Sequence, residues 1–195
     1  PMPRKIQLNE QQQLAVDFAL EAGAHPSRLV GAIKGAAGTG KTATLIRIAN
    51  LYAKKWGGES ILFAAPTHKA CGVLSKDIEG WKTGVEVMTI ARLTGVSADK
   101  SYDQDAFGQL QDRAAKSFEK YAKKLKTLIV DESSMIKQSD ADLLDALTEK
   151  FDINLIFTGD EYQLPPVKKK SKDGAEDGEE ENLEESDFET FDKMC

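Results

Sequence analysis

The residues with the clearest chemical meaning form one glycine-rich stretch, Gly35-Ala36-Ala37-Gly38-Thr39-Gly40-Lys41-Thr42. This stretch fits the pattern G-x-x-x-x-G-K-[ST], which binds the phosphates of nucleoside triphosphates. Its glycines let backbone N–H groups curl toward phosphate oxygens. Lys41 supplies a compact positive charge, and Thr42 supplies a hydroxyl for Mg²⁺, which prefers oxygen ligands. We therefore expect this phosphate-binding loop to hold a nucleotide and Mg²⁺.

Two carboxylates follow the apolar run 128–130, at Asp131 and Glu132. In open α/β sheets, ligands bind beyond the carboxyl ends of the strands. We expect Asp131 to hold Mg²⁺ through water and Glu132 to orient and deprotonate the attacking water. A pair of exposed loop acids is the structural alternative. Their position about 90 residues after the phosphate-binding loop favours the catalytic interpretation.

Apolar runs of strand length alternate along the chain with patterns of helical periodicity, and Asn9 and Ser139 stand where helix N-caps are expected. Strands are predicted at 29–34, 60–65, 85–89, 127–130 and 153–158, and helices at 8–22, 41–55, 67–78, 107–124 and 139–150. This alternation predicts an α/β fold, with a parallel sheet covered by helices on both faces.

The charge of this chain is unevenly distributed. Residues 173–195 hold eleven acids and one lysine, a net charge of −10, whereas residues 1–172 carry a net charge of +4. A mildly basic body can meet phosphates, although +4 is unremarkable over this length. The stretch 168–186 is too charged to bury a core, so we expect a solvated, mobile linker there; acidic mimicry of nucleic acid is the alternative.

The apolar runs and the cysteines of this chain bear on two further classes, membrane-spanning proteins and proteins with disulfide or cysteine–metal sites. No run of about eighteen apolar residues is present, so no membrane span is expected. Cys71 and Cys195 lie far apart and lack metal-ligand spacing. We expect reduced, ordinary thiols in a cytoplasmic protein, in a bacterial or phage-infected cell.

Four further segments make the chain resemble the superfamily 1 helicases. They are similar, in the right order, to the Q motif and to motifs Ia, II and III: Gln12-Gln13-Leu14-Ala15, Ala65-Pro66-Thr67-His68-Lys69-Ala70, Asp131-Glu132-Ser133-Ser134-Met135 and Gly159-Asp160-Glu161-Tyr162-Gln163-Leu164-Pro165-Pro166-Val167. The likeness is strongest to the RecD-like and phage Dda-like branch, superfamily 1B. It implies a RecA-like ATPase fold that uses ATP, Mg²⁺ and single-stranded DNA.

The resemblance also implies roles for single residues. Gln12 would read the adenine edge, and Gln163 would sense the γ-phosphate. Pro66, Thr67 and His68 would line the path of single-stranded DNA. Gln12 as an ordinary exposed glutamine and His68 as a helix-terminal residue without a ligand are the alternatives.

Two places depart from the pattern of this branch. Thr89 stands where the branch often has T-x-H, and Ala91 replaces the histidine, which leaves Thr89 as the expected phosphate contact. Residues 97–126 occupy the place of a small inserted subdomain and show no clear β-hairpin signal. Aromatic residues in this segment, Phe107, Phe118 and Tyr121, could pack on the domain or meet DNA, and packing is the favoured interpretation.

The resemblance implies three segments. Residues 1–167 would form the RecA-like domain, 168–186 the charged linker, and 187–195 the start of a connection to a second motor domain. No arginine follows Arg113, so this chain cannot supply the arginines of that second domain. The resemblance thus implies a monomeric N-terminal motor domain of a 5′→3′ DNA helicase. An ATP-switched nucleic-acid-binding module and an RNA helicase are the alternatives.

Overall fold

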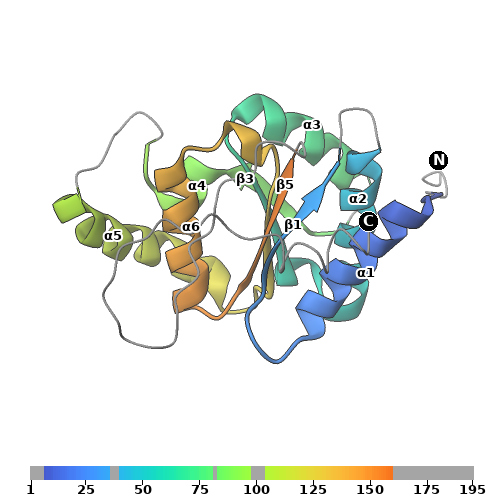
Figure 1. Ribbon diagram of the computed structural model, residues 1–195, viewed down its shortest axis with the longest axis horizontal. Helices are drawn as coiled ribbons and strands as arrows, with labels where there is room; N and C mark the ends of the chain where they lie inside the picture. The colour runs from blue at the N-terminus through green and yellow to red at the C-terminus, as the bar shows by residue number, and fades with distance from the viewer. Residues whose placement is uncertain (1–6, 36–39, 81–82, 98–103, 160–195) are drawn as a thin grey trace, which may run out of the picture.

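A five-stranded parallel sheet forms the centre of the computed structural model, which describes residues 7–35, 40–80, 83–97 and 104–159 (Figure 1). The strand order is β1-β5-β4-β2-β3. The strands are β1 (Val30–Lys34), β2 (Ile61–Ala65), β3 (Glu86–Thr89), β4 (Thr127–Val130) and β5 (Asn154–Gly159). The helices are α1 (Glu10–Ala24), α2 (Lys41–Trp56), α3 (His68–Glu79), α4 (Ile90–Thr94), α5 (Gln104–Ala122) and α6 (Gln138–Lys150), with 3₁₀ turns η1 (Gly58–Ser60) and η2 (Ser133–Met135).

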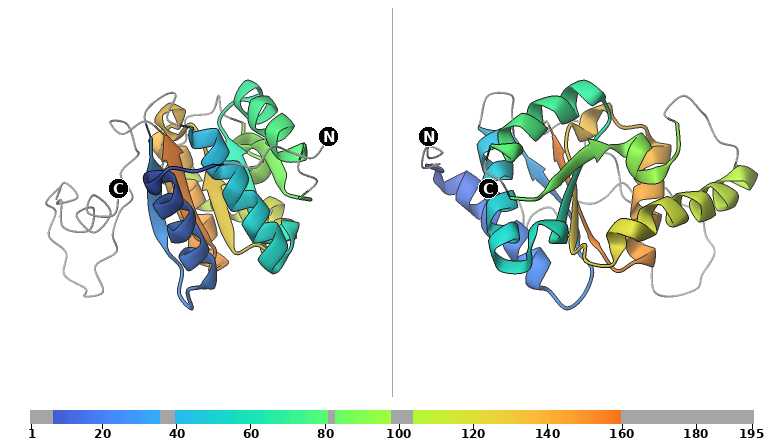
Figure 2. Two further views of the ribbon diagram at one scale, coloured as in Figure 1. Left: turned by 90° about the vertical axis from the view of Figure 1, so that its right-hand side faces the viewer. Right: turned by 180° about the vertical axis from the view of Figure 1, so that it is seen from behind.

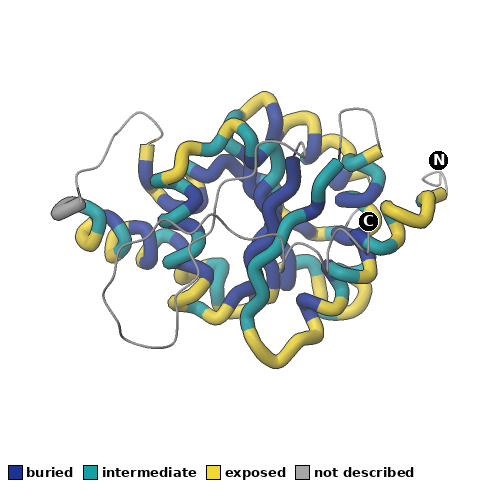
Figure 3. The backbone as a smooth tube through the Cα atoms, viewed as in Figure 1, coloured by how far each residue is buried: buried dark blue, intermediate teal, exposed yellow. Residues whose placement is uncertain are grey.

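Helices cover both faces of this sheet (Figure 2). Alternate residues of a strand point to opposite faces, so each strand contributes to two cores. Phe63, Ile129 and Ile156 pair across three strands and pack against α1, α2 and α3. Their neighbours, among them Leu128 and Leu155, pack against α4, α5 and α6. Figure 3 shows the resulting buried centre, and the predicted α/β fold is confirmed.

A buried polar network joins the helices to the amino-terminal edge of the sheet. The Tyr52 hydroxyl donates to the Ala19 carbonyl at 2.5 Å and lies 2.9 Å from the Thr127 hydroxyl. The Asn154 amide donates to the Ala22 carbonyl at 2.8 Å, and its oxygen accepts from the Leu29 backbone N–H at 2.8 Å. Burial raises the pKa of Tyr52 to about 12. The network therefore ties α1 and α2 to β4 and β5.

We expect Tyr52→Phe to lower the free energy of unfolding by about 1–3 kcal/mol, because a buried carbonyl and a buried hydroxyl each lose a partner. The hydroxyl also makes stability depend on pH. An unfolded tyrosine ionises near pH 10 and Tyr52 near 12, so its contribution is complete below pH 10 and is lost as pH rises through 12. Urea unfolding between pH 7 and 12 should show this difference between wild type and variant.

The half-buried Tyr121 on α5 supplies the matched control. Tyr121→Phe should change the unfolding free energy by less than about 0.5 kcal/mol. Equal stabilities of wild type and Tyr52→Phe at every pH would contradict the role of the network.

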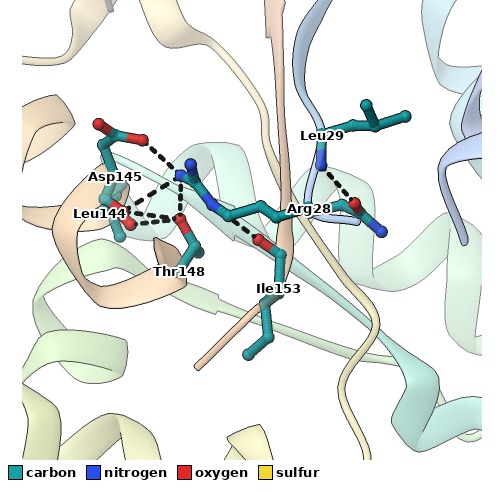
Figure 4. Close-up of polar contacts among 7 residues, drawn as sticks. Arg28, Leu29, Leu144, Asp145, Thr148 and Ile153 are labelled. Carbon is teal, nitrogen blue, oxygen red and sulfur yellow. Dashed lines mark hydrogen bonds and ion pairs between the residues drawn. The ribbon is translucent and has the colours of Figure 1, made fainter. Parts of the chain in front are cut away.

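Arg28 fixes the entry to β1, the strand that leads to the phosphate-binding loop (Figure 4). Its guanidinium donates to the Ile153 carbonyl at 3.2 Å, to the Thr148 hydroxyl at 2.9 Å and to the Asp145 carboxylate. An arginine can make these bonds together because its donors form a rigid planar fork. The chain two residues before β1 is thus anchored to α6 and to the residue before β5.

Two details differ from the sequence-based expectations. Helix α6 begins at Gln138 with Lys137 as its N-cap, so Ser139 lies inside the helix and the predicted cap is wrong. A hydrogen bond from the Gln138 side chain to Asp142, 2.9 Å long, supports this earlier start. Helix α4 was not predicted, because five residues are too few to show a periodic pattern.

The segment 97–126 is a helix in its described part, and no strand occurs there among the residues described. Phe118 is fully buried, and Phe107 and Tyr121 pack against the same core, which confirms the packing interpretation. The predicted boundary at residue 167 and the segments 168–186 and 187–195 lie outside the described residues. Among the helices described, none has the length and apolar character to cross a membrane.

Candidate nucleotide site

The described ends of the phosphate-binding loop connect β1 to α2. The Gly35 N–H donates to the Gly159 carbonyl at 3.1 Å, which holds the start of the loop beside the end of β5. Gly40 is the N-cap of α2 with a left-handed backbone, φ 79°, and Lys41 and Thr42 form the first turn of the helix. A helix N-terminus presents free N–H groups and a positive dipole end to an anion. Ala36, Ala37, Gly38 and Thr39 lie outside the described residues.

Gln12 lies against the end of this loop. Its side-chain oxygen Oε1 accepts from the Asn9 backbone N–H at 2.9 Å, and its backbone N–H donates to the Asn9 side-chain oxygen at 2.8 Å, which makes a capping box for α1. A Cβ added to Gly40 would lie 2.3 Å from the Gln12 amide nitrogen. Gln12 is therefore half-buried beside Gly40 and not fully exposed, while the reading of adenine by Gln12 stays a prediction.

We expect Gly40→Ala to lower Mg-ATP affinity at least about tenfold and to cost roughly 1–2 kcal/mol of stability. The added Cβ overlaps Gln12, and a left-handed backbone is strained for alanine. Gly72→Ala on α3 is the matched control, because a Cβ there meets nothing within 4 Å. It should keep the affinity and stabilise the helix by about 0.5–1 kcal/mol. Titration of a fluorescent ATP analogue and thermal unfolding test both variants, and equal affinity of the two would contradict the expectation.

Asp131 sits directly beyond β4, where two donors reach one of its carboxylate oxygens. Lys41 Nζ lies 3.2 Å from Asp131 Oδ1, and the Thr158 hydroxyl donates to the same oxygen at 2.6 Å. The Asp131 N–H donates to the Ala64 carbonyl at 2.8 Å, which continues the pairing of β4 with β2. The structure therefore brings the phosphate-binding lysine and the predicted Mg²⁺ carboxylate together, although they are far apart in sequence.

The donor set fits Mg²⁺. Thr42 offers a hydroxyl and Asp131 a carboxylate, both oxygen ligands. Across the residues described, no group of three or more His, Cys, Asp or Glu side chains could hold a metal alone. Magnesium commonly binds through one or two carboxylates together with substrate phosphates, so a metal bound here would need the nucleotide as well.

Glu132 has an unusual backbone. Its φ of 52° and ψ of 41° are left-handed, and it is the N-cap of the 3₁₀ turn η2. Left-handed non-glycine residues are uncommon and tend to occur at functional sites. The side chain is half-buried.

Nearby on α3, burial raises the pKa of the Cys71 thiol, and the charges of Glu132 and Asp131 raise it further, so this thiol is protonated at neutral pH.

The predicted nucleic-acid residues lie at the same edge of the sheet. Pro66 and Thr67 follow β2 and are half-buried, and His68 is exposed at the start of α3. The Thr67 hydroxyl accepts from the Ala70 N–H at 3.1 Å, so this residue is a helix N-cap. Thr67 and His68 thus stand near the surface, beside the end of the strand next to β4.

Thr89 has a different environment from the one expected. It ends β3, in register with Ala65, and it is the N-cap of α4, where its hydroxyl accepts from the Arg92 N–H at 3.1 Å. Only 5% of its surface is exposed. Burial and capping disfavour the phosphate contact predicted for Thr89. Gln163 lies outside the described residues.

Sequence reasoning missed Thr158 and Ser133. Thr158 contacts Asp131 as described, and the Ser133 hydroxyl donates to the Thr158 carbonyl at 2.9 Å. Both residues are buried. Their only sequence signal is position, since Ser133 follows the acid pair and Thr158 directly precedes the segment 159–167.

A parallel sheet, a glycine-rich loop that opens a helix, and a lysine paired with an acid beyond a neighbouring strand together define a P-loop nucleotide-binding domain. The family described as AAA domain matches residues 7–174. The chain belongs to this AAA domain family, and the superfamily 1B helicase motor domain predicted from its motifs is confirmed.

Several known proteins are similar to this chain. The ATP-dependent DNA helicase PIF1 of Saccharomyces cerevisiae is 31% identical over 143 residues, which are 69% of this chain and 15% of that protein. The ATP-dependent DNA helicase RRM3 of the same species is 33% identical over 150 residues, 71% of this chain and 18% of that protein. The crystal structure of Pif1 helicase from Candida albicans matches 84% of this chain and 34% of that one, with a TM-score of 0.59 and 22% identity.

The chain spans a third or less of the length of the curated relatives it matches. The relatives therefore contain much that this chain does not.

Proposed function

We propose that this chain is the ATP-binding motor domain of an ATP-dependent DNA helicase, and that it couples ATP hydrolysis to 5′→3′ movement along single-stranded DNA. The observation that carries the proposal is the pairing of Lys41 with Asp131 at 3.2 Å. This pair brings the phosphate-binding helix and the acidic strand end to one place. The named relatives, both ATP-dependent DNA helicases, support the choice of DNA.

The site residues divide the chemistry between them. Lys41 exchanges Asp131 for the phosphates when the nucleotide binds. Thr42 and Asp131 would hold Mg²⁺, which supplies positive charge against the charge of the transferring phosphoryl group. Glu132 orients the attacking water and accepts its proton.

The nucleic-acid partner is proposed to run past the carboxyl ends of β2 and β3. His68 and Thr67 lie there, beside the end of β4 where the acids are. Because the DNA site and the nucleotide site share this edge, a small shift at one can reach the other through adjacent strand ends. A second motor domain outside this chain is proposed to close the nucleotide site and to supply cationic groups to it.

The proposal predicts weak Mg-ATP binding and little hydrolysis by the 195-residue chain alone. In a longer protein that also contains the second motor domain, it predicts unwinding of DNA with a 5′ single-stranded tail and faster ATP turnover with single-stranded DNA than with RNA. Faster turnover with RNA would favour an RNA helicase. Nucleotide-dependent changes in DNA affinity without turnover in the longer protein would favour the binding-module alternative and overturn the proposal.

A further inference from the structure

We propose that Thr158 is a positioning residue that holds the Asp131 carboxylate in place when Lys41 leaves it for the nucleotide. This inference rests on the proposed nucleotide function of the site. It adds a role for a side chain that belongs to neither the phosphate-binding loop nor the acid pair.

The geometry at one oxygen atom carries the first step. Asp131 Oδ1 receives the Thr158 hydroxyl at 2.6 Å and faces Lys41 Nζ at 3.2 Å. The Asp131 side chain is 14% exposed and Thr158 is fully buried. Both donors thus occupy the same oxygen, which leaves the second oxygen for another partner.

Thr158 is itself held firmly. The Ser133 hydroxyl donates to its carbonyl at 2.9 Å, and a Cβ added to Gly159 would lie 2.7 Å from that hydroxyl. On the other side, the Gly35 N–H donates to the Gly159 carbonyl at 3.1 Å. The end of β5 is therefore bonded both to the start of the phosphate-binding loop and to the acidic turn, and Thr158 has little freedom to move.

Nucleotide binding should affect Lys41 and Thr158, the two donors to Asp131, differently. Lys41 is flexible and carries the charge that phosphates attract. Thr158 has no charge and stays buried, so its hydrogen bond persists after Lys41 has moved. A hydroxyl–carboxylate bond of this length is charge-assisted and strong. It keeps Oδ1 occupied and would leave Oδ2 for Mg²⁺ or its water ligands.

The test compares Thr158→Val with Thr158→Ser in the 195-residue chain. Valine keeps the branched shape and removes the donor, whereas serine keeps the donor. Affinity for a fluorescent ATP analogue is measured across a Mg²⁺ titration and again in EDTA. Mg²⁺ should raise the nucleotide affinity of wild type, and we expect valine to reduce this gain in affinity by about tenfold. A reduction of about tenfold corresponds to the loss of one charge-assisted hydrogen bond. We expect less than about twofold change in EDTA, and serine to behave as wild type.

Equal Mg²⁺ dependence of wild type and Thr158→Val, or a serine variant as weak as the valine variant, would overturn the inference. Thermal unfolding shows whether the valine variant is folded, and Thr158→Ala gives the same comparison if it is not. Failure of the wild-type chain to bind Mg-nucleotide at all would instead count against the proposed function, so the two failures are distinguishable.

Discussion

Replacing Lys41 with alanine is expected to lower the affinity of this chain for Mg-ATP by about ten- to a hundredfold. Hydrogen bonds to charged groups are worth about 1.5–3 kcal/mol, and each 1.4 kcal/mol is tenfold in affinity. The fold should survive, because Asp131 keeps the Thr158 hydroxyl as a partner and its side chain is not fully buried. Titration with a fluorescent ATP analogue measures the loss directly.

Lys54→Ala is the matched control, because Lys54 is exposed in the last turn of the same helix. It removes an equal charge from α2 at the end away from the loop, and its affinity should stay within about twofold of wild type. If Lys41→Ala bound Mg-ATP as tightly as Lys54→Ala, the loop would not be the phosphate site.

The second large effect is expected for Glu132→Gln in a protein that contains both motor domains. Turnover should fall about 10²–10⁴-fold, because glutamine cannot accept the proton of the attacking water. Nucleotide affinity should change little, since Glu132 is assigned to the water and not to the phosphates. Glutamine has the same size and the same Cβ, so it fits the left-handed backbone at this position as well as glutamate does.

Glu86→Gln controls for the loss of one negative charge. Glu86 is exposed at the opposite end of the sheet, where β3 begins, and its replacement should leave turnover unchanged. Steady-state ATPase rates with saturating single-stranded DNA compare the two variants. Turnover of Glu132→Gln within about threefold of wild type would remove Glu132 from the role of general base.

Features set by neighbouring residues could be predicted from the sequence. The N-cap of α1 can be predicted from Asn9 and from Gln12, three residues away. The strand β4 can be predicted from its own run of apolar residues. Adjacent residues also explain why the loop at Gly40 and the acids after β4 were found. Such signals are local, so a single pass along the chain detects them.

The remaining features depend on residues that only the fold brings together. Thr158 and Asp131 are 27 residues apart, and the hydrogen bond between Arg28 and Thr148 joins residues 120 apart. No spacing rule connects such pairs, because the path between them runs through whole helices and strands. The phosphate contact was predicted for Thr89 because the sequence does not reveal its burial. That burial depends on how β3 and α4 pack in the folded chain.

The position of β5 has a consequence for how this domain is made. Among the strands described, β1 pairs with β5 alone, and Val30 meets Leu155 across 125 residues. During synthesis, β1 is therefore made 125 residues before β5, its neighbour among the described strands. Contacts across such a long separation form slowly, and unpaired strand edges attract other chains. Until β5 is in place, the polypeptide exposes an open strand edge next to the phosphate-binding loop, and the start of that loop lacks the Gly159 carbonyl that accepts from the Gly35 N–H.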